Sequence, residues 1–263
     1  MRALWTAASG MKSQQLNIDT ISNNLANVNT TGYKKQRIEF KDLLYEQLRR
    51  TNLNEGEGKP VNLEVGHGVM PSATVRSFIQ GSFEQTNNNL DLAINGDGFF
   101  MVRDANDNLF FTRDGSFKLS IDAGEARLTT SDGYFVQSDI GDVELGDNIA
   151  DIFVSPDGVV SVQRTDSAEI EEIAQLTLVR FPNPAGLESV GKNLLKETTA
   201  SGEYVEAFNG DAGEILQGFL ETSNVQVVEE MIKLITAQRA YEINSKSIQT
   251  ADEMLQMANN LRR

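Results

Sequence analysis

The chain has 263 residues, 40% of them hydrophobic, and a formal net charge of −15. This length allows one large domain or two smaller ones with a sizeable core. The charge argues against nucleic acid as a partner, because phosphate backbones recruit Lys and Arg, and the absence of Cys excludes disulfides, thiolate metal sites and thiol nucleophiles.

The N-terminal segment predicts one long helix. Apolar residues recur between positions 4 and 28 in steps of three and four, which indicates a helix from about Ala3 to Val28, about 40 Å long. Gln14 interrupts this stripe and is expected to set the register of a helix pair. Asn and Thr then accumulate up to Gly32 and end the helix. The stripe positions that we assign to an assembly interface are Leu4, Met11, Ile18, Ile21, Leu25 and Val28.

A basic cluster follows, formed by Lys34, Lys35 and Arg37. It is too small for a nucleic-acid patch and lacks interleaved aromatic residues, so a solvated face or a contact with the acidic part of a neighbouring copy fits better. The polar segment at about 46–65 indicates an exposed loop or extended arm. It lacks apolar periodicity, so only neighbouring structure could order it.

From about Val69 to Phe181 the pattern is that of β-structure. Asp-Gly pairs that are closely followed by an aromatic residue begin at positions 97, 114 and 132, and their intervals of 17 and 18 residues suit hairpins. Apolar and polar residues alternate around Asp91 and Thr177, which predicts strands with one solvent-exposed and one buried face. We therefore expect an antiparallel sandwich or open barrel, which the two prolines at positions 182 and 184 end.

The C-terminal helix is predicted from Ser223 to Leu261, about 58 Å long and free of Gly and Pro. Ser223 and Gln226 have the spacing of a capping box, and Glu229 and Lys233 that of an i,i+4 ion pair. One side of the helix is expected to be apolar. The positions on it that we assign to the assembly interface are Val228, Met231, Ile235, Tyr241, Ile248 and Leu255.

Catalytic and cofactor-binding patterns are not found. The single histidine, His67, lies between two glycines, without the partners that a metal site or a Ser-His-Asp triad requires. No complete dinucleotide or phosphate loop is present, and no pair stands out among the 38 acidic residues. Residues 104–108 resemble the start of a calcium loop, but Leu109 replaces the required Gly, so a hairpin turn is expected. We expect no enzyme activity, no cofactor and no metal.

These elements together predict an α+β fold. A discontinuous α-helical coiled coil would form from the two termini, residues 1–30 and 223–263, because long helices with an apolar seam need each other or other copies of the chain. Residues 31–72 and 185–222 would connect it, with the extended arm, to a mainly antiparallel β-rich outer domain at 73–184. No stretch approaches the roughly 20 apolar residues of a membrane span, so no membrane insertion is expected.

Three parts of the chain resemble the bacterial flagellar rod and hook protein family. They are residues 4–11 (LWTAASGM) with 21–34 (ISNNLANVNTTGYK), residues 90–100 (LDLAINGDGFF) and residues 238–246 (QRAYEINSK). Together these motifs are highly specific, and the likeness covers nearly the whole chain. The length and residues 181–187 (FPNPAGL) favour the distal-rod branch over the hook, with the proximal-rod branch as the alternative.

The resemblance implies a structural subunit of the distal rod, which polymerises into a hollow helical tube and transmits torque from motor to hook. A heterologous contact that does not close generates such a filament. The implied partners are further copies of the chain, proximal rod proteins, the hook protein, surrounding ring proteins and the flagellar export apparatus. The implied place is the periplasm-spanning rod. Export would be uncleaved, because the N-terminal run is too short and polar for a signal peptide.

The residues alone leave another class open. A coiled-coil stalk could present a β-head to a ligand, although such a head should expose aromatic residues, and the single Trp5 lies in the predicted helix. The two helices could also pair within a monomer. Asp at Ile21 or Ile235 should stop assembly and leave the β-region folded, because each substitution buries a charge.

Overall fold

The computed structural model describes residues 2–49, 63–122, 125–146, 149–165, 170–207 and 213–260. The chain divides into two compact units. The first consists of Met1–Ala26, Gln36–Val75 and Gln226–Arg263, and the second of Asn27–Lys35 and Arg76–Val225. The α+β class is therefore confirmed, with helices in the first unit and most strands in the second.

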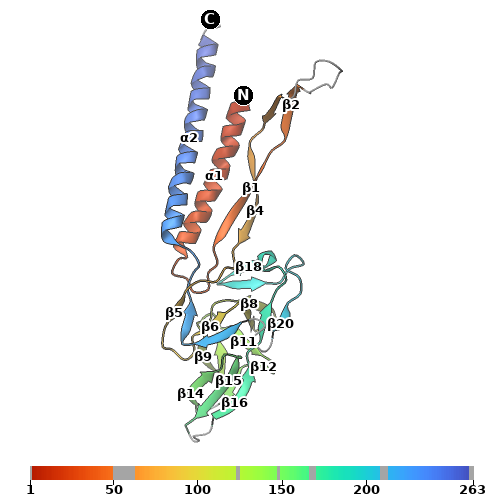
Figure 1. Cartoon of the computed structure of the whole chain (residues 1–263), viewed down its shortest axis with the longest axis vertical. Helices are drawn as coiled ribbons and strands as arrows, with labels where there is room; N and C mark the ends of the chain where they lie inside the picture. The colour runs from red at the N-terminus through yellow and green to blue at the C-terminus, as the bar shows by residue number, and fades with distance from the viewer. Residues whose placement is uncertain are drawn as a thin grey trace, which may run out of the picture. The chain divides into compact units, whose positions relative to one another are not determined.

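Two antiparallel helices, α1 (Arg2–Ala26) and α2 (Val227–Asn260), form the body of the first unit (Figure 1). Gly10 lies against Asn244, and Asn24 bonds to Glu230, so the facing residue numbers run in opposite directions. The α1 helix ends at Ala26, two residues before the predicted Val28, and a turn rich in Asn and Thr follows it.

The α2 helix begins later than predicted because the expected capping box does not form. The Ser223 hydroxyl accepts a hydrogen bond from Val225 N instead of from the helix. The backbone carbonyl of Gln226 accepts from Glu230 N and opens the first helical turn. The predicted ion pair of Glu229 with Lys233 is present at 4.0 Å.

An antiparallel arm accompanies α1 in the first unit (Figure 1). Its inner ladder joins β1 (Gln36–Asp42) to β4 (Val69–Arg76), and its outer ladder joins β2 (Tyr45–Arg49) to β3 (Leu63–Gly66). The flanks of the predicted polar arm are thus paired strands, since backbone ladders do not need apolar periodicity. The remaining arm residues, 50–62, lie outside the described residues.

An antiparallel sheet with 11 described strands organises the second unit. Its central strand β7 (Phe99–Arg103) pairs with β8 (Leu109–Thr112), β11 (Phe135–Ser138) and β17 (Leu178–Arg180). The other strands of this sheet are β9 (Lys118–Asp122), β10 (Glu125–Thr129), β12 (Gly141–Asp142), β13 (Glu144–Gly146), β18 (Glu188–Gly191), β19 (Leu194–Lys196) and β20 (Val205–Ala207).

Smaller antiparallel groups complete the second unit. A three-stranded sheet contains β14 (Ile149–Val154), β15 (Val159–Arg164) and β16 (Ile170–Gln175). Two further pairs join β6 (Leu92–Asn95) to β21 (Glu214–Gln217) and β5 (Phe83–Gln85) to β22 (Phe219–Glu221). The prolines at 182 and 184 introduce only a short 3-10 turn, η1 (Pro184–Gly186), so the β-structure does not end at Phe181 as predicted.

Core residues cover both faces of the central strand. Phe100 and Val102 belong to one hydrophobic cluster, and Phe99 and Met101 to another. Asp91 and Thr177, which the sequence placed on solvent-exposed faces of other strands, are buried at 6% and 3% exposure, so that prediction is wrong at both positions. A strand covered on both sides has no solvated face to carry polar residues.

Only one of these three Asp-Gly pairs, the ones with a following aromatic residue, makes a hairpin turn. Gly133, with φ +85°, connects the paired strands β10 and β11. The pairs at 97–98 and 114–115 join strands that do not pair with each other in the described sheets. A Cβ on Gly115 would lie 1.6 Å from the Leu92 carbonyl oxygen, so glycine is needed there for close backbone approach.

The predicted turn at 104–108 is confirmed. Asp104 N donates to Asn108 O between β7 and β8, and Asp107 adopts φ +62°. Asp and Asn tolerate this left-handed conformation better than most residues. None of the described helices is long and apolar enough to cross a membrane.

Candidate assembly surfaces

Small side chains line the contact between α1 and α2. Ala7 and Ala237 are buried at 7% and 3% exposure. A Cβ on Gly10 would lie 2.9 Å from the side-chain nitrogen of Asn244. Small residues allow two helices to approach closely, because the side chains at the contact set the interaxial distance. Some of the larger apolar side chains of α2, such as Val228 and Ile235, lie exposed on other faces.

One buried polar cluster crosses this helix contact. The Asn24 amide donates to Glu230 Oε2 at 3.2 Å and to Gln36 O at 2.8 Å, and it accepts from Gln36 N at 2.9 Å. Glu230 also accepts from Lys233 Nζ at 2.9 Å. Asn24 and Glu230 are each 1% exposed. Asn24 therefore holds the end of α1 to the starts of α2 and β1, whereas Gln14, the predicted register residue, is only partly buried.

The predicted interface residues of α1 lie near the inner side of the first unit. Ile21 is 4% exposed. Partly buried positions are Leu4, Met11, Ile18 and Leu25. Val28 is also partly buried, but it belongs to the second unit. Their role in contacts between subunits stays a prediction.

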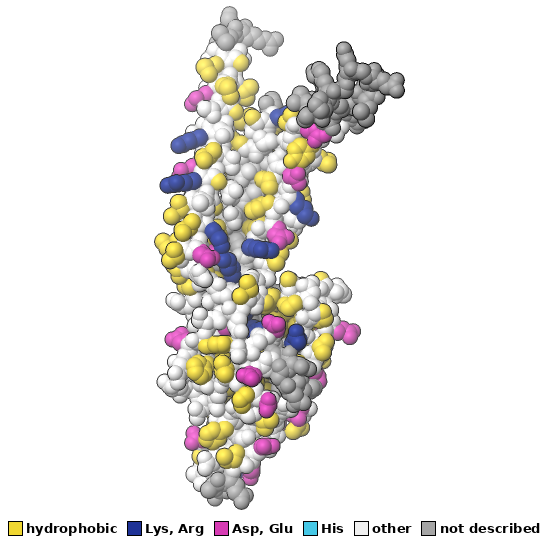
Figure 2. Space-filling view, in the orientation of Figure 1, with side chains coloured by type: hydrophobic (Ala, Val, Ile, Leu, Met, Phe, Trp, Pro, Cys, Tyr) yellow, Lys and Arg dark blue, Asp and Glu magenta, His cyan; other side chains and the backbone are white. Residues whose placement is uncertain are grey.

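The predicted apolar side of α2 is divided between different faces. Val228, Met231 and Ile235 are 71%, 50% and 48% exposed. At 3.6 residues per turn, Ile248 and Leu255 lie on the same face as the buried Ala237, roughly opposite these three. Hydrophobic side chains gather over the first turns of α2 in Figure 2. We call this group the outer patch, and its members are Val227, Val228, Met231, Ile232 and Ile235.

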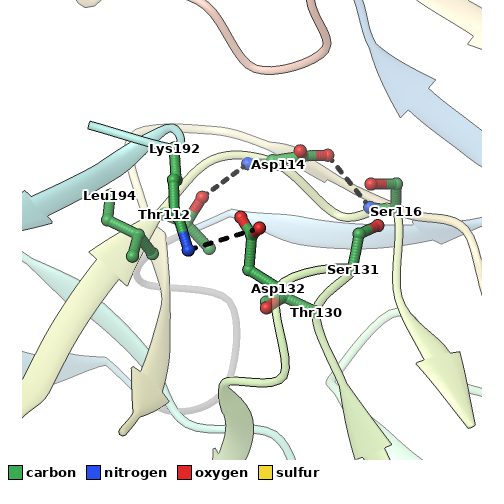
Figure 3. Close-up of a pocket in the computed structure, with 8 residues that line it drawn as sticks. All are labelled: Thr112, Asp114, Ser116, Thr130, Ser131, Asp132, Lys192 and Leu194. Carbon is green, nitrogen blue, oxygen red and sulfur yellow. Dashed lines mark hydrogen bonds and ion pairs between the residues drawn. The ribbon is translucent and has the colours of Figure 1, made fainter.

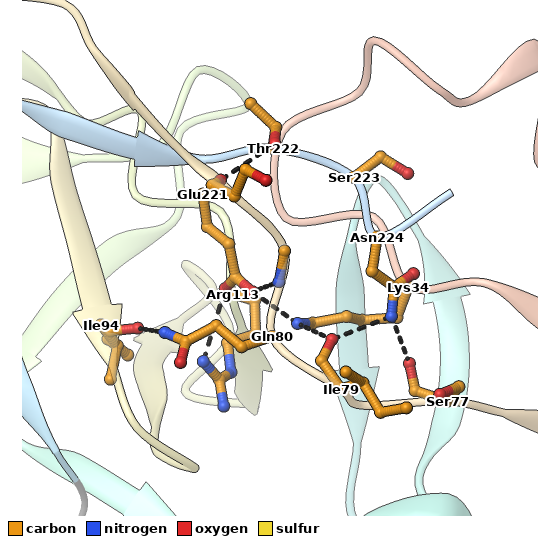
Figure 4. A network of polar contacts seen from close by, with 12 residues as sticks. Lys34, Ser77, Ile79, Gln80, Ile94, Arg113, Glu221, Thr222, Ser223 and Asn224 are labelled. Atoms are coloured by element: carbon orange, nitrogen blue, oxygen red, sulfur yellow. Dashed lines mark hydrogen bonds and ion pairs between the residues drawn. The ribbon is translucent and has the colours of Figure 1, made fainter. Parts of the chain in front are cut away.

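A buried ion cluster marks the second unit (Figure 4). Lys34 Nζ donates to Glu221 Oε1 at 2.6 Å and to Ile79 O at 3.0 Å. Arg113 donates to Glu221 Oε2 at 3.4 Å and to Gly96 O at 2.7 Å. Lys34 is 4% exposed, so the predicted solvated basic face is wrong for this residue. It holds for Arg37, whose exposed guanidinium pairs with Glu39 at 3.1 Å.

Burial dominates the electrostatics of this cluster. Desolvation lowers the pKa of Lys34 and of Arg113, and the nearby Glu221 carboxylate opposes both shifts. Gly32 N donates to Glu221 O at 2.8 Å, and Lys35 N donates to the side-chain oxygen of Asn224. The segment after α1 is therefore fixed to the strand β22 within the second unit.

A small polar hollow lies where three turns of the second unit meet (Figure 3). Its volume is about 30 Å³, and Lys192 Nζ lies 3.5 Å from Asp132 Oδ1 across it. This volume holds one or two waters, far less than the roughly 300 Å³ of a small-molecule site. Among the described residues no group of three His, Asp or Glu side chains is placed to hold a metal ion.

Three family models match the chain. The model described as flagella basal body rod protein matches residues 4–34. The flagellar hook protein FlgE/F/G D1 domain matches residues 93–162, and the flagellar basal body rod FlgEFG protein C-terminal model matches residues 216–261. Fold and matches together define the class, a structural and non-enzymatic subunit of the flagellar basal body.

Curated relatives align along the whole chain. The flagellar basal-body rod protein FlgG of Borreliella burgdorferi is 49% identical over 268 residues, covering 100% of this chain and 99% of that protein. FlgG of Caulobacter vibrioides is 43% identical over 267 residues, covering 100% of both chains. The chain belongs to the FlgG family of flagellar basal-body rod proteins, the distal rod family. Membership implies assembly with copies of itself and with other rod and hook components.

Proposed function

We propose that this chain polymerises into the hollow helical tube of the distal rod and transmits torque from the motor to the hook. The observation that carries the proposal is the outer patch on α2. Its large apolar side chains are exposed although α2 already contacts α1 along its inner face. Contiguous apolar patches on a surface mark sites of protein association.

The division of α2 into two faces gives each predicted interface residue a role. Inner residues such as Ile21 and Ile248 would hold α1 to α2 as a discontinuous coiled coil. Outer residues such as Val228 and Ile235 would contact a neighbouring copy. In this proposal the outer patch meets a different surface of the neighbouring copy, so the contact is heterologous, and a heterologous contact that does not close produces a filament.

The wider arrangement follows from the same proposal. The terminal helices, 1–30 and 223–263, would form the inner layer of the tube, and the β-rich region at 73–184 would face outward, toward the ring proteins. Residues 31–72 and 185–222 would connect the layers. Neighbours at the two ends would be proximal rod proteins and the hook protein. The flagellar export apparatus would deliver the chain across the inner membrane without cleavage of a signal peptide.

The proximal rod is the alternative position that the sequence leaves open. The flagellar hook-basal body complex protein FlhP of Bacillus subtilis is 34% identical over 272 residues, covering 100% of both chains. This relative carries a different name, yet it matches nearly as well as FlgG of the same species, which is 35% identical over 272 residues. Complementation of strains that lack either the distal or the proximal rod protein separates the two positions, because only the correct one restores motility.

The test of the proposal is a single charge on the outer patch. Ile235→Asp should leave the monomer folded, because Ile235 is 48% exposed, but should abolish tube formation in electron micrographs and motility in cells. Gln249→Asp is the matched control, since it adds the same charge to an exposed position of α2 outside the patch. Tubes formed by Ile235→Asp as readily as by Gln249→Asp would contradict the proposal.

Ile21→Asp should disturb the monomer itself, unlike Ile235→Asp. Ile21 is buried, so this change should release α1 within the monomer and block assembly, at a cost of about 4 kcal/mol to the first unit. The second unit should keep its β-structure by circular dichroism. Assembly that survived both Asp substitutions would exclude a tube built through the terminal helices.

A further inference from the structure

The first unit has a second apolar surface, a hollow beside the start of α1. Its volume is about 390 Å³, and it is lined by Arg2, Trp5, Thr6, Leu43, Gly66 and His67. Trp5 is 76% exposed and is the only tryptophan of the chain. We call this feature the Trp5 hollow.

The walls of the Trp5 hollow are fixed to each other. A Cβ on Gly68, which has φ +113°, would lie 2.1 Å from Ser9 Oγ, so the turn between β3 and β4 is pressed against α1. Val69 N donates to Ser9 Oγ at 3.4 Å, and Leu43 N donates to Gly68 O at 3.0 Å. The hollow is therefore a built feature rather than a gap between loosely placed segments.

A matching apolar element lies at the other end of the chain. Gly10 faces Asn244, so the antiparallel pair places Arg2 opposite about Asp252, and α2 continues beyond this point to Asn260. We call residues 254–257 the overhang, and Figure 1 shows α2 extending past the start of α1. Within it, Met254, Leu255 and Met257 are 60%, 44% and 58% exposed.

We propose that the overhang of one copy inserts into the Trp5 hollow of a second copy. The inference rests on the proposed function and names a contact between subunits within it. Ala237 and Ala251 lie on the face of α2 that packs on α1, and Leu255 lies on the same face, beyond the first residue of α1. This face of α2 therefore extends past the helix that it contacts. A further copy supplies the missing apolar surface.

The chemistry of the two surfaces agrees with a protein occupant. Tryptophan, tyrosine and methionine are enriched at the cores of protein interfaces. Methionine adapts its shape and makes favourable contacts with aromatic rings, which suits Met254 and Met257 against Trp5. Tyr45 at 55% exposure and Leu44 at 87% follow Leu43 at the edge of the hollow and extend the apolar surface. Hollow and overhang differ, so their contact is also heterologous, as an open filament requires.

The absence of cysteine from the chain makes a cross-linking test direct. Thr6→Cys and Met257→Cys are placed on separate copies and coexpressed in cells that lack the wild-type chain. Isolated rods are then treated with a short bismaleimide. We expect a mixed dimer at least 5-fold more abundant than in the control, which pairs Thr6→Cys with Gln249→Cys at an exposed position outside the overhang.

Each outcome of the cross-linking experiment either supports or overturns the inference. Rods that contain both variants but give no mixed dimer above the control overturn the inference and leave the proposed function intact. Cross-linking of Thr6→Cys to itself also overturns it, because two hollows would then face each other. Failure of the wild-type chain to enter rods at all would instead contradict the proposed function.

A second measurement needs no cysteine. Acrylamide quenching of the single Trp5 compares the dilute wild-type chain with its assembled tube. We expect quenching to fall several-fold on assembly, and to remain high when Met254→Glu and Met257→Glu are combined. Trp5 that stays equally quenchable in wild-type tubes shows that no subunit covers the hollow. Trp5 that becomes protected in tubes of the double variant shows that something other than the overhang covers it.

Discussion

Lys34 Nζ lies 2.6 Å from Glu221 Oε1, and the two side chains are only 2% and 1% exposed. The residues are 187 positions apart, one just before β1 and the other in β22. Arg113 approaches the same carboxylate, so two buried cations share one anion. This cluster joins the first and last segments of the second unit.

Because two cations share one carboxylate, replacing Glu221 should lower the free energy of unfolding more than replacing Lys34. Glu221→Gln leaves two buried cations without a counter-charge and should lower the free energy of unfolding by about 4 kcal/mol. Lys34→Met leaves a neutral pair of Glu221 with Arg113 and should cost about 1 kcal/mol. Urea unfolding followed by circular dichroism measures both. Lys192→Met, which removes an exposed ion pair with Asp132, is the control and should change little. Equal costs for Glu221→Gln and Lys34→Met would contradict this assignment.

Alkaline pH should stabilise the wild-type chain relative to Lys34→Met. Burial lowers the folded-state pKa of Lys34 below 10.5, its usual value in the unfolded chain. Between these two pKa values the unfolded chain binds more protons, so the contribution of Lys34 to stability rises with pH. At pH values below the folded-state pKa, Lys34 is charged in both states, and the full cost of burying its charge lowers the stability. The measurement is the difference in unfolding free energy between the two proteins as pH approaches 10.5. A difference that falls would mean that Glu221 raises the pKa.

The sequence predicts the helices and turns of this fold better than the contacts that these elements make with each other. The ends of α1 and the turn at 104–108 follow from local signals, because Asn, Thr, Asp and Gly act on their own backbone. Asn24 belongs to the same group of stop signals, yet it is the buried link between α1, α2 and β1. Only tertiary structure distinguishes these uses, since its partners Gln36 and Glu230 are remote from any local pattern.

The sequence identifies the apolar residues of the candidate surfaces, but it does not show which face of the helix each residue occupies. Apolar periodicity identifies α2, but it cannot say which apolar residues contact α1 when the helix carries two unlike apolar surfaces. Small residues such as Ala237 take the inner contact, and Val228 and Ile235 are left outside. The burial of Lys34 had no sequence signal at all, since lysine is almost never fully buried unless it is paired.

Asn24→Asp should loosen the helix pair. An aspartate cannot donate to Gln36 O, and it places a second carboxylate beside Glu230, where Asn24 Nδ2 now lies 3.2 Å from Oε2. We expect a loss of about 3 kcal/mol in the first unit, seen as faster amide hydrogen exchange in α1. Adding Glu230→Gln should recover at least about 1 kcal/mol, because the like charges are removed. Ser22→Asp, at an exposed position of α1, should cost less than about 1 kcal/mol. No recovery in the double variant would exclude a direct contact.

Gly68→Ala should detach the arm from α1. Gly68 has φ +113°, and an added Cβ would lie 2.1 Å from Ser9 Oγ and 3.5 Å from the Thr6 backbone, so both conformation and space require glycine. Gly133→Ala is the matched control, because Gly133 also has a positive φ of +85° but nothing lies within 4 Å of its added Cβ. The control should show only the conformational cost of about 1 kcal/mol. Gly68→Ala should cost about 3 kcal/mol, because the steric overlap adds to this strain. Trp5 fluorescence reports the change directly, since the Gly68 turn holds one wall of the hollow beside it. Equal effects of the two substitutions on stability and on Trp5 emission would show that the arm is not fixed to α1 through Gly68.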